Sequence, residues 1–242
     1  MSWRVGTVTA VRDETSTART IALDVPDWPG HLAGQHVDLR LTAPDGYTAT
    51  RSYSIASAVD GARVEVTVQK VPDGEVSPYL TEVLPVGAAL ELRGPLGGWF
   101  VWRPEDPAPV QLIAGGSGVV PLMAMLRTHA RSSSSSPARL LYSVRDPASV
   151  IYRDELRAVT DGGPRELTLA WTRAAPEGTD RPPGRVDAQL LAAATLPPAD
   201  RPTCFVCGPT GFVETVADLL VAGGHDPARI RTERFGPTGG RG

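Results

Sequence analysis

Cysteine is scarce in this chain, which carries only Cys204 and Cys207 among its 242 residues. Structural zinc sites and cysteine-ligated iron–sulfur clusters each use four ligands, and no second cysteine pair complements this C-x-x-C spacing. The four histidines show no ligand spacing either. We therefore expect no metal site and no cluster in this sequence. A redox-active pair or half a zinc site stays open as an alternative.

Long apolar runs and an excess of one charge are also missing. A membrane-spanning helix needs roughly 18 or more apolar residues in succession, and the sequence has no such run. The net charge is −3 and the pI about 5.8, which gives no reason to expect a nucleic-acid or membrane partner. Residues Met1–Val5 enter a strand-like pattern and lack the apolar region of a signal peptide. We expect a cytoplasmic monomer.

Residues 1–100 alternate apolar and polar side chains over short segments, separated by turn residues such as Pro72-Asp73-Gly74. This pattern predicts a six-stranded antiparallel β-barrel. The expected strands are Thr7–Arg12, Arg19–Val25, His36–Leu41, Ala49–Ala56, Arg63–Gln69 and Ala88–Leu92. One helix is expected at Ser77–Leu84, where Ser77 suits the N-cap and Pro78 the first helical position.

From residue 108 onward, apolar strands alternate with helices, which predicts an α/β domain with a parallel sheet and helices on both faces. The expected strands are Val110–Ala114, Arg139–Val144, Leu167–Thr172, Thr203–Val206 and Ile230–Phe235. The expected helices are Val119–Ala130, Asp154–Val159, Asp187–Ala194 and Gly211–Ala222. The chain is long enough for two cores. Because Arg103–Ala108 is rich in proline and charge, we expect domains over 1–104 and 105–242.

The segment Arg51-Ser52-Tyr53-Ser54 is the first candidate for chemistry. Strand alternation places Arg51 and Tyr53 on one face and the two serines on the other. An arginine can bind phosphate through two hydrogen bonds, and a tyrosine ring can stack on an aromatic cofactor. The alternative is an edge strand with a solvated arginine and a half-buried tyrosine.

Two glycine-containing turns are candidates for phosphate binding. Gly74–Ser77 precedes the expected short helix, where backbone N–H groups and a serine hydroxyl can bind an anion. A simple helix cap would use the same donors. Gly115–Gly118 joins a strand to a helix, as in dinucleotide-binding folds, although Pro121 stands where a third glycine of G-x-G-x-x-G would be. A tight turn that needs positive φ is the alternative.

The segment Cys207-Gly208-Pro209 ends the expected fourth strand of the α/β domain. In open α/β sheets, ligands bind at the carboxyl ends of the strands. The alternative is that Cys207 is simply buried.

Taken in order, these motifs resemble those of the ferredoxin–NADP reductase superfamily over nearly the whole chain. Arg51–Ser54 matches its R-x-Y-[ST] flavin motif, and Gly94–Gly97 is similar to its G-P-x-G segment. Gly116–Pro121 resembles G-T-G-I-A-P, Cys207–Pro209 resembles C-G-P, and Glu233–Phe235 resembles the E-x-aromatic sequence near the family's C-terminus.

The resemblance implies an FAD site in the barrel. Arg51 would pair with the pyrophosphate, Tyr53 would stack on the isoalloxazine and Ser54 would lie near N5, while Phe235 would cover the other flavin face. The position of the tail Gly236–Gly242 stays open. The expected FAD-binding residues are Arg51, Ser52, Tyr53, Ser54, Val68, Gln69, Lys70, Gly74, Glu75, Val76, Ser77 and Phe235.

The resemblance also implies a nicotinamide nucleotide site in the second domain, with Ser54, Cys207 and Glu233 around the hydride path as catalytic residues. Arg145, Arg173 and Arg185 are placed as in members that use NADP, and a 2′-phosphate needs such cations. We expect NADPH to be preferred over NADH. The expected nucleotide-binding residues are Gly116, Ser117, Gly118, Arg145, Thr172, Arg173, Arg185, Cys207, Gly208 and Pro209.

The resemblance implies an FAD-dependent oxidoreductase that takes hydride from NADPH or NADH and passes electrons to a separate acceptor, a small ferredoxin that serves an oxygenase. One alternative is a reductase of free flavin or another small acceptor. Others are a non-catalytic flavin-carrying electron-transfer subunit of a larger complex, or an α/β domain whose motifs have decayed. The intact Ser54, Cys207 and Glu233 argue against the last.

Overall fold

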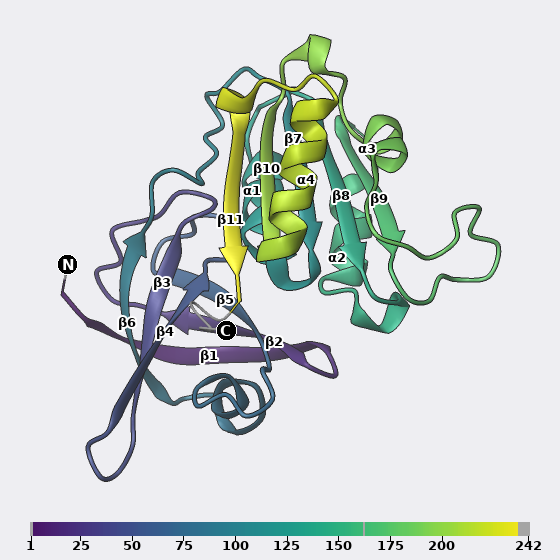
Figure 1. Ribbon diagram of the computed structural model, residues 1–242. Helices are drawn as coiled ribbons and strands as arrows, with labels where there is room; N and C mark the ends of the chain where they lie inside the picture. Colours follow the sequence, from purple (N-terminus) through teal and green to yellow (C-terminus); the bar gives the residue numbers. More distant parts are fainter. Residues whose placement is uncertain (1, 162, 237–242) are drawn as a thin grey trace. The chain divides into compact units, whose positions relative to one another are not determined.

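The computed structural model describes residues 2–161 and 163–236. Grouped by contacts, the chain forms two units, one of Met1–Pro104 with Met123–Ser132 and one of Glu105–Leu122 with Ser133–Gly242. Figure 1 labels their helices and strands. Each unit has its own sheet and its own cluster of buried apolar side chains.

The sheet of the first unit is antiparallel and contains six of the described strands (Figure 1). They are β1 (Arg4–Thr15), β2 (Ala18–Asp24), β3 (His36–Thr42), β4 (Thr48–Ser54), β5 (Arg63–Gln69) and β6 (Ala89–Leu96). Their order is β4-β3-β6-β1-β2-β5. Just past β4, Ile55 bridges to Val66 of β5, and the Ala56 N–H donates to the Glu65 carbonyl over 2.7 Å. The outer strands therefore meet, and the predicted six-stranded barrel is confirmed.

Alternating side chains of these strands fill the interior of the barrel. Val64, Val66 and Val68 of β5 are fully buried, and Leu39 of β3 and Leu92 of β6 belong to the same cluster. Burying each such aliphatic side chain contributes about 1.5–3 kcal/mol. Successive residues of a strand face opposite sides. The residues of β3 and β4 that alternate with these buried side chains therefore face outward.

The helix expected at Ser77–Leu84 is shorter and of a different kind. It is a π-helix, η1 (Tyr79–Val83), whose first turn receives no hydrogen bond from a capping side chain. The Ser77 hydroxyl instead accepts a hydrogen bond from the Val71 N–H over 3.0 Å. The prediction that Ser77 caps this helix is therefore wrong, because its hydroxyl closes the preceding loop.

The second unit contains a parallel sheet in the order β11-β10-β7-β8-β9. Its described strands are β7 (Val110–Gly115), β8 (Ala138–Val144), β9 (Arg165–Trp171), β10 (Thr203–Pro209) and β11 (Ile230–Phe235). The helices between them are α1 (Val119–Arg131), α2 (Arg153–Thr160), α3 (Ala188–Ala194) and α4 (Thr210–Ala222). This confirms the predicted α/β fold, with boundaries moved by a few residues. Helix α1 begins in this unit, and its residues from Met123 onward group with the first.

Helices cover both faces of this sheet (Figure 1). α3 and α4 pack on one face, where Leu191 and Val216 join Ile113 of β7 and Leu141 of β8 in one buried cluster. α2 lies on the opposite face. The chain runs outward from β7 through β8 to β9 and then returns to β10 on the other side of β7. The carboxyl ends of β7 and β10 therefore form a topological switch point, where open α/β sheets bind their ligands.

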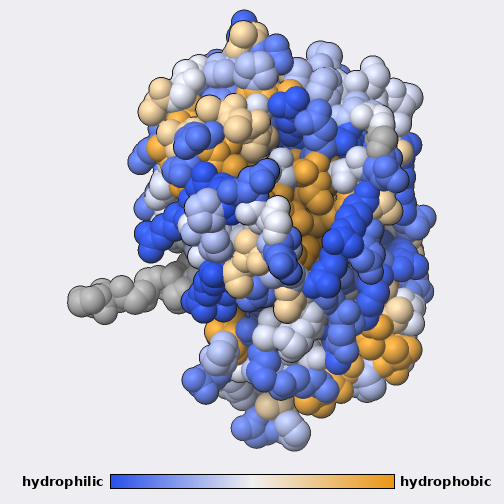
Figure 2. Space-filling model, turned by 90° about the vertical axis from the view of Figure 1, so that its right-hand side faces the viewer, coloured by the Kyte–Doolittle hydropathy of each residue, from blue (hydrophilic) through white to orange (hydrophobic). Residues whose placement is uncertain are grey.

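The face drawn in Figure 2 is mostly hydrophilic, and its hydrophobic side chains gather in a few separate patches. No described helix has the length and apolar character needed to cross a membrane. Tyr47, in the turn between β3 and β4, is one of the exposed large side chains, at 57%. Its hydroxyl takes part in the site of the first unit.

Candidate functional site

Strand β4 presents its motif on two faces, as predicted. The β3 partners of Arg51, Ser52, Tyr53 and Ser54 are Leu39, Asp38, Val37 and His36. Cross-strand partners face the same side of a sheet. Leu39 and Val37 belong to the barrel core, so Arg51 and Tyr53 lie on the interior side of the strand and the two serines on the outer side.

Arg51 connects β4 with the loop that follows β5. One of its guanidinium nitrogens donates to Glu75 over 2.8 Å and another to the Thr50 carbonyl over 2.8 Å. The Tyr47 hydroxyl also donates to Glu75, over 3.2 Å. The structure therefore brings together Arg51 and the Gly74–Ser77 loop, two of the predicted phosphate-binding elements.

The Tyr53 ring is partly buried against the barrel core. Burial raises the pKa of its hydroxyl to about 12, against the opposing effect of the Arg51 charge. The phenol is therefore neutral at physiological pH. The exposed part of the Tyr53 ring can stack on an aromatic group of a ligand, and the neighbouring Arg51 can bind a phosphate of the same ligand.

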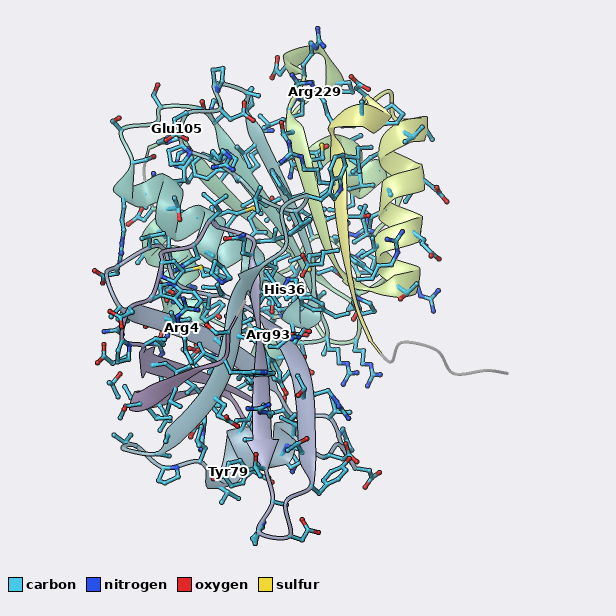
Figure 3. The ribbon with its side chains drawn as sticks, turned by 90° about the vertical axis from the view of Figure 1, so that its left-hand side faces the viewer. Arg4, His36, Tyr79, Arg93, Glu105 and Arg229 are labelled. Atoms are coloured by element: carbon cyan, nitrogen blue, oxygen red, sulfur yellow. The ribbon has the colours of Figure 1, made fainter. Side chains whose placement is uncertain are left out.

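The outer face of β4 is held by a hydrogen-bonded network. Ser52 donates to Asp38 over 2.7 Å, and Arg93, labelled in Figure 3, donates to the other oxygen of Asp38 over 2.7 Å. Burial raises the pKa of Asp38, but the hydrogen bonds from Ser52 and Arg93 outweigh it and keep that pKa below its usual value. The Ser52 hydroxyl thus anchors β4 to its neighbours, while Ser54 is buried at the end of the strand.

The loop after β5 is tightly closed. The Gly74 N–H donates to the Val71 carbonyl over 3.1 Å, and a Cβ added at Gly74 would lie 3.0 Å from both the Ser77 hydroxyl and that carbonyl. Lys70 pairs with Glu82 over 2.6 Å, and its N–H donates to the Thr17 carbonyl over 2.7 Å. Lys70 is thus engaged within the barrel by both its backbone and its side chain.

The glycine-rich turn after β7 lies against the end of β10. Gly116 has φ +55°, a conformation that favours glycine. A Cβ added at Gly118 would lie 2.1 Å from the Cys207 carbonyl oxygen. The turn continues through η2 (Gly116–Gly118) directly into α1. This close backbone approach at the switch point fits the phosphate-binding role that the sequence predicts for the turn.

Cys207 and Glu233 are register partners on the adjacent strands β10 and β11. Cys207 is fully buried, and burial together with the Glu233 charge raises the pKa of its thiol well above the usual value. The thiol is therefore neutral and suited to packing rather than nucleophilic attack. Cys204 lies three residues earlier, on the other face of the strand, and both cysteines are free. Within the described residues, no group of three or more potential ligands could hold a metal ion.

The predicted 2′-phosphate arginines follow β8 and β9. The Arg173 N–H donates to the Arg145 carbonyl over 2.9 Å, and Gly184, next to Arg185, donates to the Trp171 carbonyl over 2.9 Å. The backbone thus gathers all three at the carboxyl ends of these strands. Their side chains are exposed. In the part of the chain that the structure describes, none of the three guanidinium groups forms an ion pair, so each is available to an anionic ligand.

Arg127 and Glu65 support the site of the first unit, and neither was predicted. Arg127 of α1 donates to the Ala56 carbonyl over 2.8 Å and to Glu65 over 3.0 Å, and both charged side chains are about nine-tenths buried. Ala56 follows Ser54 by two residues, so Arg127 holds the segment that ends β4. An arginine within a helical pattern gives no sign of a distant carbonyl partner, and the sequence could not reveal this contact.

Phe235 ends β11 opposite Pro209 of β10 and is partly exposed. The open question of the tail concerns Gly236–Gly242, of which 237–242 lie outside the described residues.

The residues present fit both cofactors. In the first unit, a cation, an aromatic ring and a closed glycine loop lie together, as a flavin nucleotide requires. In the second unit, the backbone of the glycine-rich turn approaches the end of β10 so closely that a Cβ at Gly118 would not fit. Three arginines lie at the ends of neighbouring strands.

Comparison with known proteins also finds one flavin-binding and one nicotinamide-binding domain family in this chain. Residues 6–101 match the family described as an oxidoreductase FAD-binding domain, and residues 112–218 match an oxidoreductase NAD-binding domain. Ferredoxin–NADP reductase B of Sorangium cellulosum is 38% identical over 87% of this chain and 88% of that protein. The ferredoxin reductase component of 3-ketosteroid-9-alpha-monooxygenase from Rhodococcus rhodochrous is 33% identical over 97% of this chain, which spans 65% of that component.

Solved structures show the same fold. The flavohem-like FAD/NAD-binding domain of nitric oxide dioxygenase from Vibrio cholerae superposes with a TM-score of 0.86 at 27% identity, covering 97% of this chain and 99% of that one. A ferredoxin–NADP reductase from Neisseria gonorrhoeae with bound FAD and NADP has a TM-score of 0.80 at 21% identity, covering 97% of this chain and 99% of that chain. Both domain families occur in this chain in the predicted order, and its identity to a full reductase extends over most of both proteins; the chain belongs to the ferredoxin–NADP reductase family of FAD- and NAD(P)-binding oxidoreductases.

Proposed function

We propose that residues 1–104 hold FAD, that residues 105–242 hold NADPH, and that the chain passes electrons from NADPH to a separate protein acceptor. Bound FAD would supply hydride acceptance at N5 and release of single electrons. The observation that carries the proposal is that each unit contains an anion-binding arrangement of its own. In the first, Arg51 meets the Gly74–Ser77 loop; in the second, the turn at Gly118 meets the end of β10.

The chain's own residues position the two nucleotides. Arg51 would bind the flavin pyrophosphate, Tyr53 would stack on the ring system, and Ser54 would donate a hydrogen bond to the flavin. Gly116–Gly118 would admit the nicotinamide nucleotide's pyrophosphate, and Cys207 and Glu233 would line the site of its ring. These neutral and charged side chains orient the reacting rings and exclude water, which is how a protein accelerates hydride transfer between cofactors.

We further propose that the acceptor is a small ferredoxin that serves an oxygenase, and that the chain acts as a monomer. The support for the acceptor comes from relatives that are named as the reductase component of naphthalene 1,2-dioxygenase/salicylate 5-hydroxylase systems and the electron transfer component of toluate 1,2-dioxygenase. Within the described residues, this chain has no ligand group of its own for a metal cluster.

An absorbance spectrum of the purified protein, with and without NADPH, tests the proposal. The protein should be yellow, and anaerobic NADPH should bleach its flavin bands. A colourless protein that cannot be loaded with FAD would contradict the flavin assignment. A yellow protein that neither NADPH nor NADH bleaches would contradict the nicotinamide assignment alone.

Arg173→Ala should lower kcat/KM for NADPH by about 10-fold or more, because a charge-assisted hydrogen bond to phosphate contributes about 1.5–3 kcal/mol. The value for NADH should stay unchanged, since NADH lacks the 2′-phosphate. Steady-state kinetics with both nucleotides measure the two values. Arg157→Ala is the matched control, because Arg157 is an exposed arginine on α2 of the same unit. Equal losses with both nucleotides, or none, would remove Arg173 from the 2′-phosphate site.

A further inference from the structure

A carboxylate lies within the proposed pyrophosphate site. Glu75 accepts a hydrogen bond from Arg51 through Oε2 over 2.8 Å, and from the Tyr47 hydroxyl through Oε1 over 3.2 Å. The side chains of Arg51 and Glu75 are about half exposed, at 53% and 52%. The one guanidinium that the proposed function assigns to the flavin pyrophosphate is therefore already paired with an anion of the same chain.

We infer that Glu75 competes with the pyrophosphate of FAD for Arg51 and thereby sets the affinity of the chain for its flavin. This inference rests on the proposed function, in which Arg51 binds that pyrophosphate. A guanidinium presents its N–H groups in a planar fork, and carboxylate and phosphate approach it in the same way. One nitrogen of Arg51 already donates to the Thr50 carbonyl. The donor that now serves Glu75 belongs to the fork with which the guanidinium would bind a phosphate.

The local charge balance adds to the competition. Lys70, which precedes the loop that carries Glu75, is itself engaged, since it pairs with Glu82 over 2.6 Å. A pyrophosphate that reached Arg51 with Glu75 still in place would meet a carboxylate of like charge. Glu75 therefore opposes binding as long as it stays on the guanidinium.

Tyr47 holds Glu75 from a second element. It lies in the turn between β3 and β4, which is closed by the Ala43 N–H donating to the Tyr47 carbonyl over 2.8 Å and the Gly46 N–H donating to the Ala43 carbonyl over 2.9 Å. The carboxylate is thus held between two elements, through one oxygen by Arg51 and through the other by Tyr47. A glutamine at position 75 keeps an acceptor for Tyr47 but removes the charge that competes.

The test is a titration of the deflavinated full-length chain with FAD, followed by quenching of flavin fluorescence. Glu75→Gln should lower the Kd by roughly two- to fivefold, the size expected for release of an exposed ion pair. Glu91→Gln should leave the Kd unchanged; it is the matched control, because Glu91 pairs with Arg40 over 2.6 Å on the same barrel outside the proposed site. An unchanged or higher Kd for Glu75→Gln would overturn the inference.

A double-mutant cycle with Arg51→Ala identifies the cause. Arg51→Ala should weaken FAD binding, and Glu75→Gln should then bring a much smaller gain, because the contested guanidinium is gone and only the like-charge repulsion by Glu75 is removed. A gain of undiminished size without Arg51 would overturn the competition. If Arg51→Ala binds FAD as tightly as the wild type, the pyrophosphate role of Arg51 in the proposed function fails. If only the Glu75→Gln effect is missing, the proposed function stands and this inference fails.

Discussion

Gly118→Ala should remove most NADPH-dependent reduction of the flavin while FAD stays bound. The added Cβ would lie 2.1 Å from the Cys207 carbonyl oxygen and 2.7 Å from the Gly208 nitrogen. Both are backbone atoms, so no side-chain rotation relieves the contact, and the glycine turn or the end of β10 must shift by about 1 Å. A shift of that size in the groups that position a reactant reduces a rate roughly 100-fold.

Anaerobic stopped-flow measurement of flavin bleaching by NADPH gives this rate. FAD content and direct reduction by dithionite should remain at wild-type values, because Arg51, Tyr53 and Ser54, which are proposed to hold the flavin, belong to the other unit. Gly211→Ala is the control, since a Cβ at Gly211 of α4 meets no atom within 4 Å. A wild-type reduction rate for Gly118→Ala would show that the turn does not position the nucleotide.

Arg127→Met should destabilise the first unit by about 2–4 kcal/mol. The substitution leaves the buried Glu65 carboxylate with Arg63, a partner whose own side chain is 54% exposed. It also removes the donor to the Ala56 carbonyl. Breaking a buried ion pair by removing one partner costs about 3–5 kcal/mol, and the remaining bond from Arg63 reduces that loss. Urea denaturation followed by circular dichroism measures the change in the free energy of unfolding.

Two variants and the pH dependence separate this effect from a loss of packing. Arg131→Met changes an exposed arginine on the same helix and should be nearly neutral. Arg127→Met combined with Glu65→Met should recover part of the stability, because it leaves no buried charge. No recovery would assign the loss to packing.

The pH dependence has a definite sign. Burial raises the pKa of Glu65, but the hydrogen bond from Arg63 and the charges of Arg127 and Arg63 outweigh it and lower that pKa. A carboxyl with a lowered pKa in the folded state stabilises the fold above its unfolded pKa of about 4.3, and this stabilisation disappears as the pH falls through the folded pKa. The difference between the wild type and Arg127→Met should therefore shrink as the pH falls below about 4.

The order and type of nearly all elements could be predicted, because each is encoded by a local pattern. β5 and β11 were predicted with the observed bounds, since β-branched residues recur along each strand and turn residues lie close to its ends. The segment 77–84 was mispredicted in kind. A serine before a proline has the chemistry of an N-cap, but its hydroxyl is used by Val71, six residues earlier in the chain. Nothing local to the sequence decides between these two hydrogen bonds.

The candidate site was predicted as a set of residues but without their partners. Cys207 and Glu233 were both identified, whereas their pairing in register across β10 and β11 depends on sheet order. Glu75 was predicted only as part of a phosphate loop, and its bond to Arg51 spans 24 residues of sequence. Arg127 carries no motif at all, because its role depends on a carbonyl and a carboxylate supplied by the barrel.

The two-faced arrangement of β4 also limits how this segment can change in length. A single residue inserted between Thr48 and Arg51 would shift the register by one and exchange the two faces of the strand. Arg51 and Tyr53 would then lie beside Asp38, and the serines would turn toward the core. Substitutions can alter one face at a time, whereas an odd insertion disturbs both at once. Length variation should therefore be accommodated in the turn at Ala43–Tyr47 and not within the strand.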